Sequence, residues 1–288
     1  MPSVNSELTF GLEIEATQLA QSWQATCQRY GLQRVADSSI INEDGQVVGK
    51  TIGGEIITPV LSGTCMAQED GRNLSINVDA IHRQIAEAAC TVAASVNSSC
   101  GVHIHLGKPS KTDRNKSQWK PEEVRTFLVI GQLIEDRLFA VCPPSRKDSL
   151  HCKRILDCYS RDDLVSYYPV GDVKPNKRQN PKRYCWLNLI ETKRVGEKPD
   201  RRFGAGPALG TVEIRMLGNT RRFDYIWQWT QLWMKIAALV AYVPASLAIM
   251  HCMPGNSLDA DFEALATLKR MGLNENQPMI AHQHQPIE

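Results

Sequence analysis

Three stretches of the 288-residue chain carry ionisable residues at alternating positions. Residues i and i+2 of a β-strand point to the same face, so each stretch predicts a strand with one ionisable face and one apolar face. Any half-exposed strand alternates in a similar way, but Lys, Thr and Ser are then the usual polar residues. The polar positions in "FGLEIE", "CGVHIHLG" and "GTVEIRML" are restricted to Glu13, Glu15, His103, His105, Glu213 and Arg215.

Glu55, in "GGEIITPV", adds a further carboxylate at a predicted strand. If these strands are neighbours, four carboxylates and one guanidinium share a face, which gives a net charge of −3 with neutral histidines. Such a concentration of like charge must bind protons or recruit cations. Carboxylate oxygens with imidazole suit Mg²⁺ or Mn²⁺, and the absence of thiolates argues against a cysteine-type zinc site. The pattern predicts a divalent metal site that in turn binds the phosphates of a nucleotide.

The order of predicted elements favours an α+β domain. Strands cluster early and do not alternate regularly with helices, which indicates a largely antiparallel sheet. We expect one catalytic domain over residues 1–272 and a disordered tail over residues 273–288. The expected strands cover residues 8–16, 33–40, 101–107, 184–189 and 210–217, with one or two more over residues 46–60 that Pro59 stops. The expected helices cover 18–30, 74–95, 121–141, 223–250 and 259–271, and the fourth is expected to bend or break near Pro244.

Composition excludes several classes of protein. A net charge of +2 is too small to make nucleic acid the expected partner. The longest apolar run, residues 236–250, contains Pro244 and is shorter than the about 20 residues of a membrane span, so no membrane association is expected. Nine cysteines without a CxxC pair or a secretory leader predict reduced thiols and a cytoplasmic location. No oligomeric state follows from the sequence.

Basic residues are concentrated in the middle of the chain. Residues 146–202 contain 15 Lys and Arg against 8 Asp and Glu, a local net charge of +7. The stretch "GDVKPNKRQNPKRY" has the Pro, Gly and Asn content of a loop. Two interpretations stay open: a solvated loop, or a basic lid over an anionic ligand. The candidate lid residues are Lys174, Lys177, Arg178, Lys182 and Arg183.

Six motifs occur in an order that resembles the amidoligase family, the carboxylate–amine ligases with a glutamine-synthetase-like catalytic fold. They span residues 10–220 and read "FGLEIE", "ADSSI", "GGEIITPVL", "CGVHIHLG", "RYCWLNL" and "TVEIRMLGNT". The same positions are distantly similar to glutamate–cysteine ligase. The resemblance implies a curved, mostly antiparallel sheet with helices on one face, which cups ATP and two or three Mg²⁺ ions.

The resemblance also implies roles for individual residues. The implied metal ligands are Glu13, Glu15, Glu55, His103 and Glu213. Arg215 would bind the transferring phosphate, with Glu13 and Glu213 as further catalytic residues. Asp37, His105 and Asn188 would contact substrate, although Asn188 could equally cap or brace the sheet. His105 departs from the glutamate–cysteine ligases, which have a polar residue other than histidine at this position.

The activity implied by the resemblance is ATP- and Mg²⁺-dependent formation of an amide or isopeptide bond through an acyl phosphate. The substrates would be a small-molecule or peptide carboxylate and amine, whose identity the motifs leave open. Three alternatives remain: a metal-dependent hydrolase, a guanidino kinase of the same fold group, and a non-catalytic binding module. The binding module is disfavoured because every implied ligand is present in the sequence.

Overall fold

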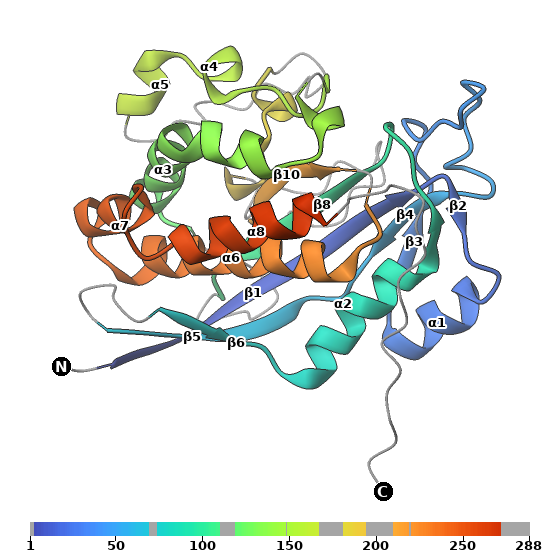
Figure 1. Ribbon diagram of the computed structural model, residues 1–288, viewed down its shortest axis with the longest axis horizontal. Coiled ribbons are helices and arrows are strands. Elements are labelled where there is room, and N and C mark those ends of the chain that lie inside the picture. Colours follow the sequence, from blue (N-terminus) through green and yellow to red (C-terminus); the bar gives the residue numbers. More distant parts are fainter. Residues whose placement is uncertain are drawn as a thin grey trace, which may run out of the picture.

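A computed structural model shows a mixed α+β fold built on a mostly antiparallel sheet that does not close into a barrel (Figure 1). The structure describes residues 3–68, 74–109, 119–147, 149–166, 181–193, 210–218 and 220–271. The eight-stranded sheet has the order β3-β4-β1-β8-β10-β9, with β5 paired to β1 and β6 paired to β5. Strands β2 and β7 form a separate pair. The tail expected over residues 273–288 lies outside the described part of the chain.

The first strand is the longest, with 14 residues. Their bounds are Ser3–Ala16 (β1), Gln18–Leu19 (β2), Gln33–Val35 (β3), Gly54–Ile57 (β4), Leu61–Gln68 (β5), Ser75–Asn77 (β6), Ala93–Ser95 (β7), Gly101–Gly107 (β8), Leu187–Asn188 (β9) and Val212–Gly218 (β10). The helices are Trp23–Tyr30 (α1), Ala80–Val92 (α2), Pro121–Val141 (α3), Ile155–Cys158 (α4), Arg161–Val165 (α5), Phe223–Tyr242 (α6), Ala245–Cys252 (α7) and Asp259–Arg270 (α8).

Strand β1 is central because it pairs with β8 along one edge and with both β4 and β5 along the other. Its apolar side chains at alternate positions, Leu8 to Ile14, are buried. Helices α2 and α6 pack on this apolar face, and α3, α7 and α8 contact α6 in turn (Figure 1). Phe10 of β1 meets Trp227 of α6 edge to face, with ring centroids 6.0 Å apart. The helices therefore leave the ionisable face of the strands to the cleft.

The motif "GGEIITPVL" contains strand β4 and ends on Leu61, the first residue of β5. Pro59 has no N–H to donate, and the ladder along β1 breaks between β4 and β5. Thr58 fills this gap: its N–H donates to Leu12 O, and its Oγ1 accepts from Leu12 N at 2.9 Å. Of the one or two strands expected over residues 46–60, the structure has one, β4, which ends before Pro59 as expected, whereas β5 was not predicted. This junction fixes the position of Glu55 beside β1.

The long apolar helix expected over residues 223–250 is broken at the expected proline. Pro244 caps α7 and separates it from α6. The helix expected over residues 18–30 begins later, at Trp23, because Gln18–Leu19 pairs with β7. The strand expected over residues 33–40 ends at Val35. Within the described residues, no helix is both long enough and apolar enough to cross a membrane.

The Arg146 side chain links the ends of β8 and β10 through hydrogen bonds next to the cleft. Its Nη2 donates to Cys100 O at 3.2 Å and to Leu217 O at 3.0 Å, and only 5% of the residue is exposed. The guanidinium passes over two glycines. A Cβ on Gly101 would lie 2.2 Å from Nη2, and a Cβ on Gly218 would lie 2.3 Å from Nε. Glycine is required at both strand ends because the arginine occupies the space of a side chain.

We predict that Gly218→Ala lowers the free energy of unfolding by about 1–3 kcal/mol, since the new methyl group forces a buried side chain to move. Urea denaturation of purified protein measures this change. Gly11→Ala is the matched control on another strand, because its Cβ would meet no atom closer than 3.8 Å. Equal stability of the two variants would contradict this account of Arg146.

Candidate active site

The strand register brings most of the predicted site residues together on the cleft face. Glu15 of β1 stands opposite Glu55 of β4, and Glu13 stands opposite His103 of β8. On the other side of β8, His105 stands opposite Glu213 of β10. Glu213 is in turn opposite Asn188 of β9. Five neighbouring strands thus contribute to one row of polar side chains, although the residues are as distant in sequence as 13 and 213.

An irregularity in β10 places Arg215 in this row. The register with β8 shifts between Ile214 and Leu217, so that Arg215 and Met216 together stand opposite one residue, His103. The Arg215 N–H donates instead to Trp186 O at 2.7 Å. Bulges of this kind re-aim side chains beside functional sites. Here the bulge leaves the guanidinium beside Glu213 and at the edge of the cleft.

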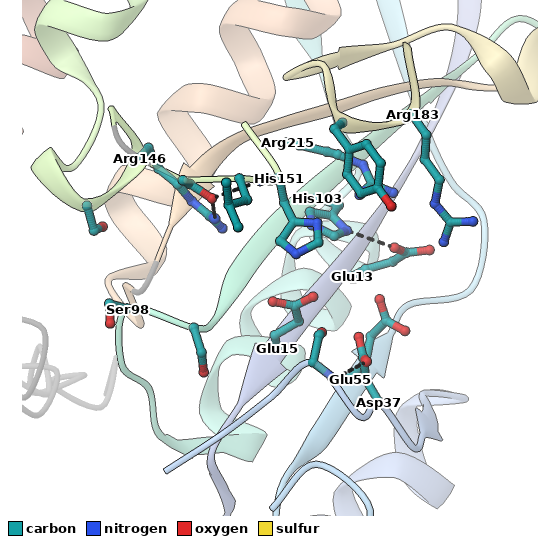
Figure 2. A pocket seen from close by; sticks show the side chains of 16 residues that line it. Glu13, Glu15, Asp37, Glu55, Ser98, His103, Arg146, His151, Arg183 and Arg215 are labelled. Atoms are coloured by element: carbon teal, nitrogen blue, oxygen red, sulfur yellow. Dashed lines mark hydrogen bonds and ion pairs between the residues drawn. The ribbon is translucent and has the colours of Figure 1, made fainter. Parts of the chain in front are cut away.

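Glu13 is the centre of a carboxylate–imidazole cluster. Its Oε2 lies 3.1 Å from His103 Nδ1, and its Oε1 lies 3.1 Å from His105 Nε2. His103 Nδ1 is also 3.3 Å from Glu213 Oε1. Both oxygens of one carboxylate therefore face imidazole nitrogens, and a second carboxylate faces the same ring. Figure 2 shows the Glu13 and His103 side chains directed toward one another.

Two side-chain donors hold the Glu213 carboxylate in place. Asn188 Nδ2 donates to Oε2 at 2.6 Å, and Arg215 Nη2 donates to the same oxygen at 3.1 Å. Arg215 Nε lies 2.8 Å from Oε1, an ion-pair contact that lacks hydrogen-bond alignment. Only 3% of Glu213 is exposed. A buried carboxylate oxygen, Oε1, is thus left without an aligned donor among the described residues.

The cluster fits a divalent metal. Two sets of side chains place their ligand atoms within 4.8 Å of one another, Glu13–Glu55–His103 and Glu13–His105–Glu213, and Glu13 belongs to both. Adjacent ligands of an octahedral ion, each about 2.1 Å from the metal, lie roughly 3.0 Å apart. The contacts of Glu13 with His103 in the first set and with His105 in the second, 3.1 Å each, match that spacing. The hydrogen-bond-free Glu213 Oε1 supports the same conclusion.

The charges shift one another's pKa values. Burial, followed by the neighbouring Glu13 carboxylate, raises the pKa of Glu55 to about 10. Burial opposes ionisation of Glu13, but His105 and His103 outweigh it and hold the pKa of Glu13 well below its usual range. Burial opposes protonation of His105, but the Glu13 carboxylate prevails and raises its pKa to about 9. In the absence of metal, protons therefore supply the positive charge that the cluster requires.

The cluster borders a cavity of about 800 Å³ with charges of both signs. Carboxylates and basic side chains line it, together with several serines. In Figure 2, Arg146 and Ser98 lie at one end, Glu55 and Asp37 lie at the other, and His151 lies between them. The charged and histidine residues of the lining are Glu13, Glu15, Asp37, Glu55, His103, Arg146, His151, Arg183 and Arg215. A ligand carrying phosphate groups, with metal beside the carboxylates, would match both signs of charge.

The remaining predicted residues are placed as follows. Asp37 lines the cavity, and its Oδ1 accepts from Ser39 N at 2.7 Å. His105 and Asn188 do not line it, and the polar contacts of Asn188 go to Glu213 and to the Ile190 N–H. Of the lid residues, Arg183 lines the cavity and Lys182 pairs with Asp163 at 2.6 Å. Lys174, Lys177 and Arg178 lie outside the described residues.

Sequence reasoning missed the opposite wall of the cavity. Arg146, His151 and Tyr184 line it together with Ser145 and Ser149. The His151 and Tyr184 rings are tilted neighbours with centroids 5.5 Å apart. These residues lie on loops and short 3-10 helices, which have no periodic pattern. One feature of the sequence could have indicated this wall: glycines stand at the ends of two predicted strands, which leaves space for a large side chain to lie across them.

Comparison of the chain with models of known protein families and with curated proteins gave no match to either. The amidoligase resemblance therefore rests on the motifs alone.

We predict that Glu55→Gln makes the metal-free protein more stable at alkaline pH. The pKa of Glu55 in the folded state is about 10 against an ordinary 4.5, so folded protein keeps a proton that the unfolded chain releases. Its contribution to stability is present in full below pH 4.5 and is lost as the pH rises toward 10. The unfolding free energy of the wild type, relative to the variant, should fall by up to about 1.4 kcal/mol per pH unit.

Urea unfolding with a chelator at several pH values between 5 and 9 measures this difference. Glu7→Gln, at an exposed position on β1, is the control and should leave the pH profile unchanged. Parallel pH profiles for the wild type and Glu55→Gln would show that Glu55 is ionised in the folded protein.

Proposed function

We propose that this protein is an ATP-dependent carboxylate–amine ligase, which forms an amide or isopeptide bond through an acyl phosphate. The observation that carries the proposal is a single cavity whose lining combines carboxylates and an imidazole of the cluster with three arginines, one of which, Arg215, pairs with Glu213 of the cluster. ATP with divalent metal has charges of both signs and suits such a cavity. The proposed fold type is the curved sheet of glutamine synthetase and glutamate–cysteine ligase, and the open antiparallel sheet is compatible with it.

The cluster would hold the metal, Mg²⁺ or Mn²⁺, through Glu13, Glu55, His103 and Glu213. When bound, the metal neutralises phosphate charge and polarises the transferring phosphoryl group. Glu15 is less available as a metal ligand, because its Oε2 accepts a hydrogen bond from the Gly101 N–H. Its second oxygen remains available to the cavity, which it lines.

Arg215 would stabilise the negative charge that spreads over the phosphoryl oxygens during transfer. Glu213 holds its guanidinium through Nη2 and Nε, and only 15% of its side chain is exposed. A guanidinium held in place before the reaction loses little entropy when it binds phosphate. Burial opposes the charge of Arg215, but Glu213 outweighs it and raises its pKa further, so the residue stays cationic.

The proposed chemistry requires no protein nucleophile. The substrate carboxylate attacks the γ-phosphorus of ATP and ADP leaves, which gives the acyl phosphate. The amine then attacks the acyl carbon, phosphate leaves and the nitrogen loses a proton, which gives the amide. All nine cysteines are free and buried, so none lines the cavity as a reactive thiol. Free, buried thiols also support our proposal of a cytoplasmic location.

The test is to incubate the protein with ATP, Mg²⁺ or Mn²⁺, and pools of carboxylic acids and amines. We expect ADP, free phosphate and a condensed product only when an acid and an amine are both present. Glu13→Gln should abolish all three products while the protein stays folded. Hydrolysis without ATP consumption would favour a hydrolase, ADP with a phosphorylated guanidine but no free phosphate would favour a kinase, and ATP binding without turnover would favour a binding module.

We predict that Arg215→Lys lowers turnover about 100-fold or more, because lysine offers a point charge in place of a planar fork. The dissociation constant of ATP should change less, since the contact strengthens as charge develops during transfer. Steady-state kinetics and calorimetry separate the two effects. Arg125→Lys, at an exposed position on α3, is the control. Wild-type turnover in Arg215→Lys would remove Arg215 from the phosphoryl site.

A further inference from the structure

We infer that the position formed by Glu13, His105 and Glu213 binds a first-row transition ion, such as Mn²⁺, Co²⁺ or Zn²⁺, in preference to Mg²⁺, with His105 Nε2 as a direct ligand. The inference refines the proposed function, because it identifies the class of metal in the same cluster and moves His105 from a substrate role to a metal role. It is tested by metal binding alone, without turnover.

His105 is oriented as metal-binding histidines usually are. Its Nδ1 lies 3.1 Å from Thr211 Oγ1, on the residue that precedes β10. Metal-ligating histidines typically use one ring nitrogen for the metal and donate the other N–H to a fixed acceptor. With Nδ1–H donated to the threonine hydroxyl, Nε2 is the nitrogen that faces Glu13 Oε1, 3.1 Å away, and a bound metal would replace its proton. This contact is not aligned as a hydrogen bond, so Nε2 has no aligned partner within the described residues.

Glu213 completes the position from the opposite side. Asn188 and Arg215 donate to Oε2, whereas Oε1 receives no aligned hydrogen bond. Oε1 has the Arg215 Nε at 2.8 Å and the His103 Nδ1 at 3.3 Å, so a second imidazole stands at the edge of the same position. A carboxylate oxygen without an aligned hydrogen bond, on a side chain that is 3% exposed, can still accept a metal ion as a further partner.

The donor set and its burial decide against Mg²⁺. Imidazole nitrogen suits transition ions, whereas Mg²⁺ prefers oxygen ligands and usually keeps several waters. The side chains around the position are mostly enclosed, with exposures of 3% for Glu213, 10% for His103, 16% for His105 and 23% for Glu13. Little room remains for a hydration shell. The position at Glu55 lies in the open cavity and can keep more water, so it remains suitable for Mg²⁺.

The experiment uses Mn²⁺ as the probe on full-length protein stripped of metal with a chelator. Electron paramagnetic resonance counts bound Mn²⁺, and pulsed measurements detect magnetic coupling to a directly bound nitrogen. We expect nitrogen-coupled Mn²⁺ that a large excess of Mg²⁺ does not displace. Thr211→Val should weaken Mn²⁺ binding about 10- to 100-fold by removing the acceptor for Nδ1–H, with Mg²⁺ affinity unchanged.

Thr230→Val is the matched control, because its hydroxyl is buried in α6 and bonds to Ile226 O within the helix. It should bind Mn²⁺ as the wild type does. His105→Asn is a second variant, which should lose the nitrogen coupling and the preference over Mg²⁺. Urea unfolding confirms that each variant is folded before titration.

Three results would overturn the inference: displacement of all Mn²⁺ by equimolar Mg²⁺, bound Mn²⁺ without nitrogen coupling, or unchanged Mn²⁺ affinity in both Thr211→Val and His105→Asn. Each would leave the proposed ligase function intact, because Mg²⁺ could still serve it. If the protein bound neither ion, the inference and the proposed function would both fail.

Discussion

Electrostatic repulsion among the carboxylates of one sheet face is the constraint on which the rest of the structure depends. Glu13, Glu15 and Glu55 come from adjacent strands, and Glu213 is buried two strands away. Two imidazoles and one guanidinium interleave with them, and Glu55 keeps its proton. The metal-free arrangement is therefore a compromise in which protons and one arginine replace part of the positive charge. A divalent cation would carry two charges and would contact the carboxylate oxygens directly, so its attraction to them would be stronger than that of the arginine.

The apolar face of the same strands stabilises the sheet against this repulsion. Helices α2 and α6 cover β1 and its neighbours with buried apolar side chains, so hydrophobic burial stabilises the sheet where its polar face destabilises it. Arg146 adds a polar fastening at the strand ends, where it satisfies two backbone carbonyls. The carboxylates and histidines of the cluster thus stand on strands. Such a scaffold keeps like charges close together even before ligand binds.

Charge of both signs in one cavity is what links the cluster to a function. An acidic cluster alone would suit many metal proteins. Arg146, Arg183 and Arg215 add a surface for an anion, and the cavity that joins the two is large enough for a nucleotide-sized ligand. The serines along the wall can orient a polar substrate without adding charge. These features together favour phosphoryl transfer from a metal–nucleotide over water activation at an isolated metal.

Local patterning in the sequence was sufficient to predict the strands β1, β8 and β10, the helix break at Pro244, and the carboxylate and histidine residues of the cluster. The period-2 alternation of a strand and the missing N–H of proline act over a few residues, so they can be read from the chain alone. Tertiary structure decided what depends on packing between distant segments. It paired Glu13 with His103 and His105 through register, and it added β5 after β4 along the same edge of β1. It also placed the loop residues Arg146, His151 and Tyr184 opposite the carboxylates, where no local period could signal them, because their positions follow from how the loops cross the sheet.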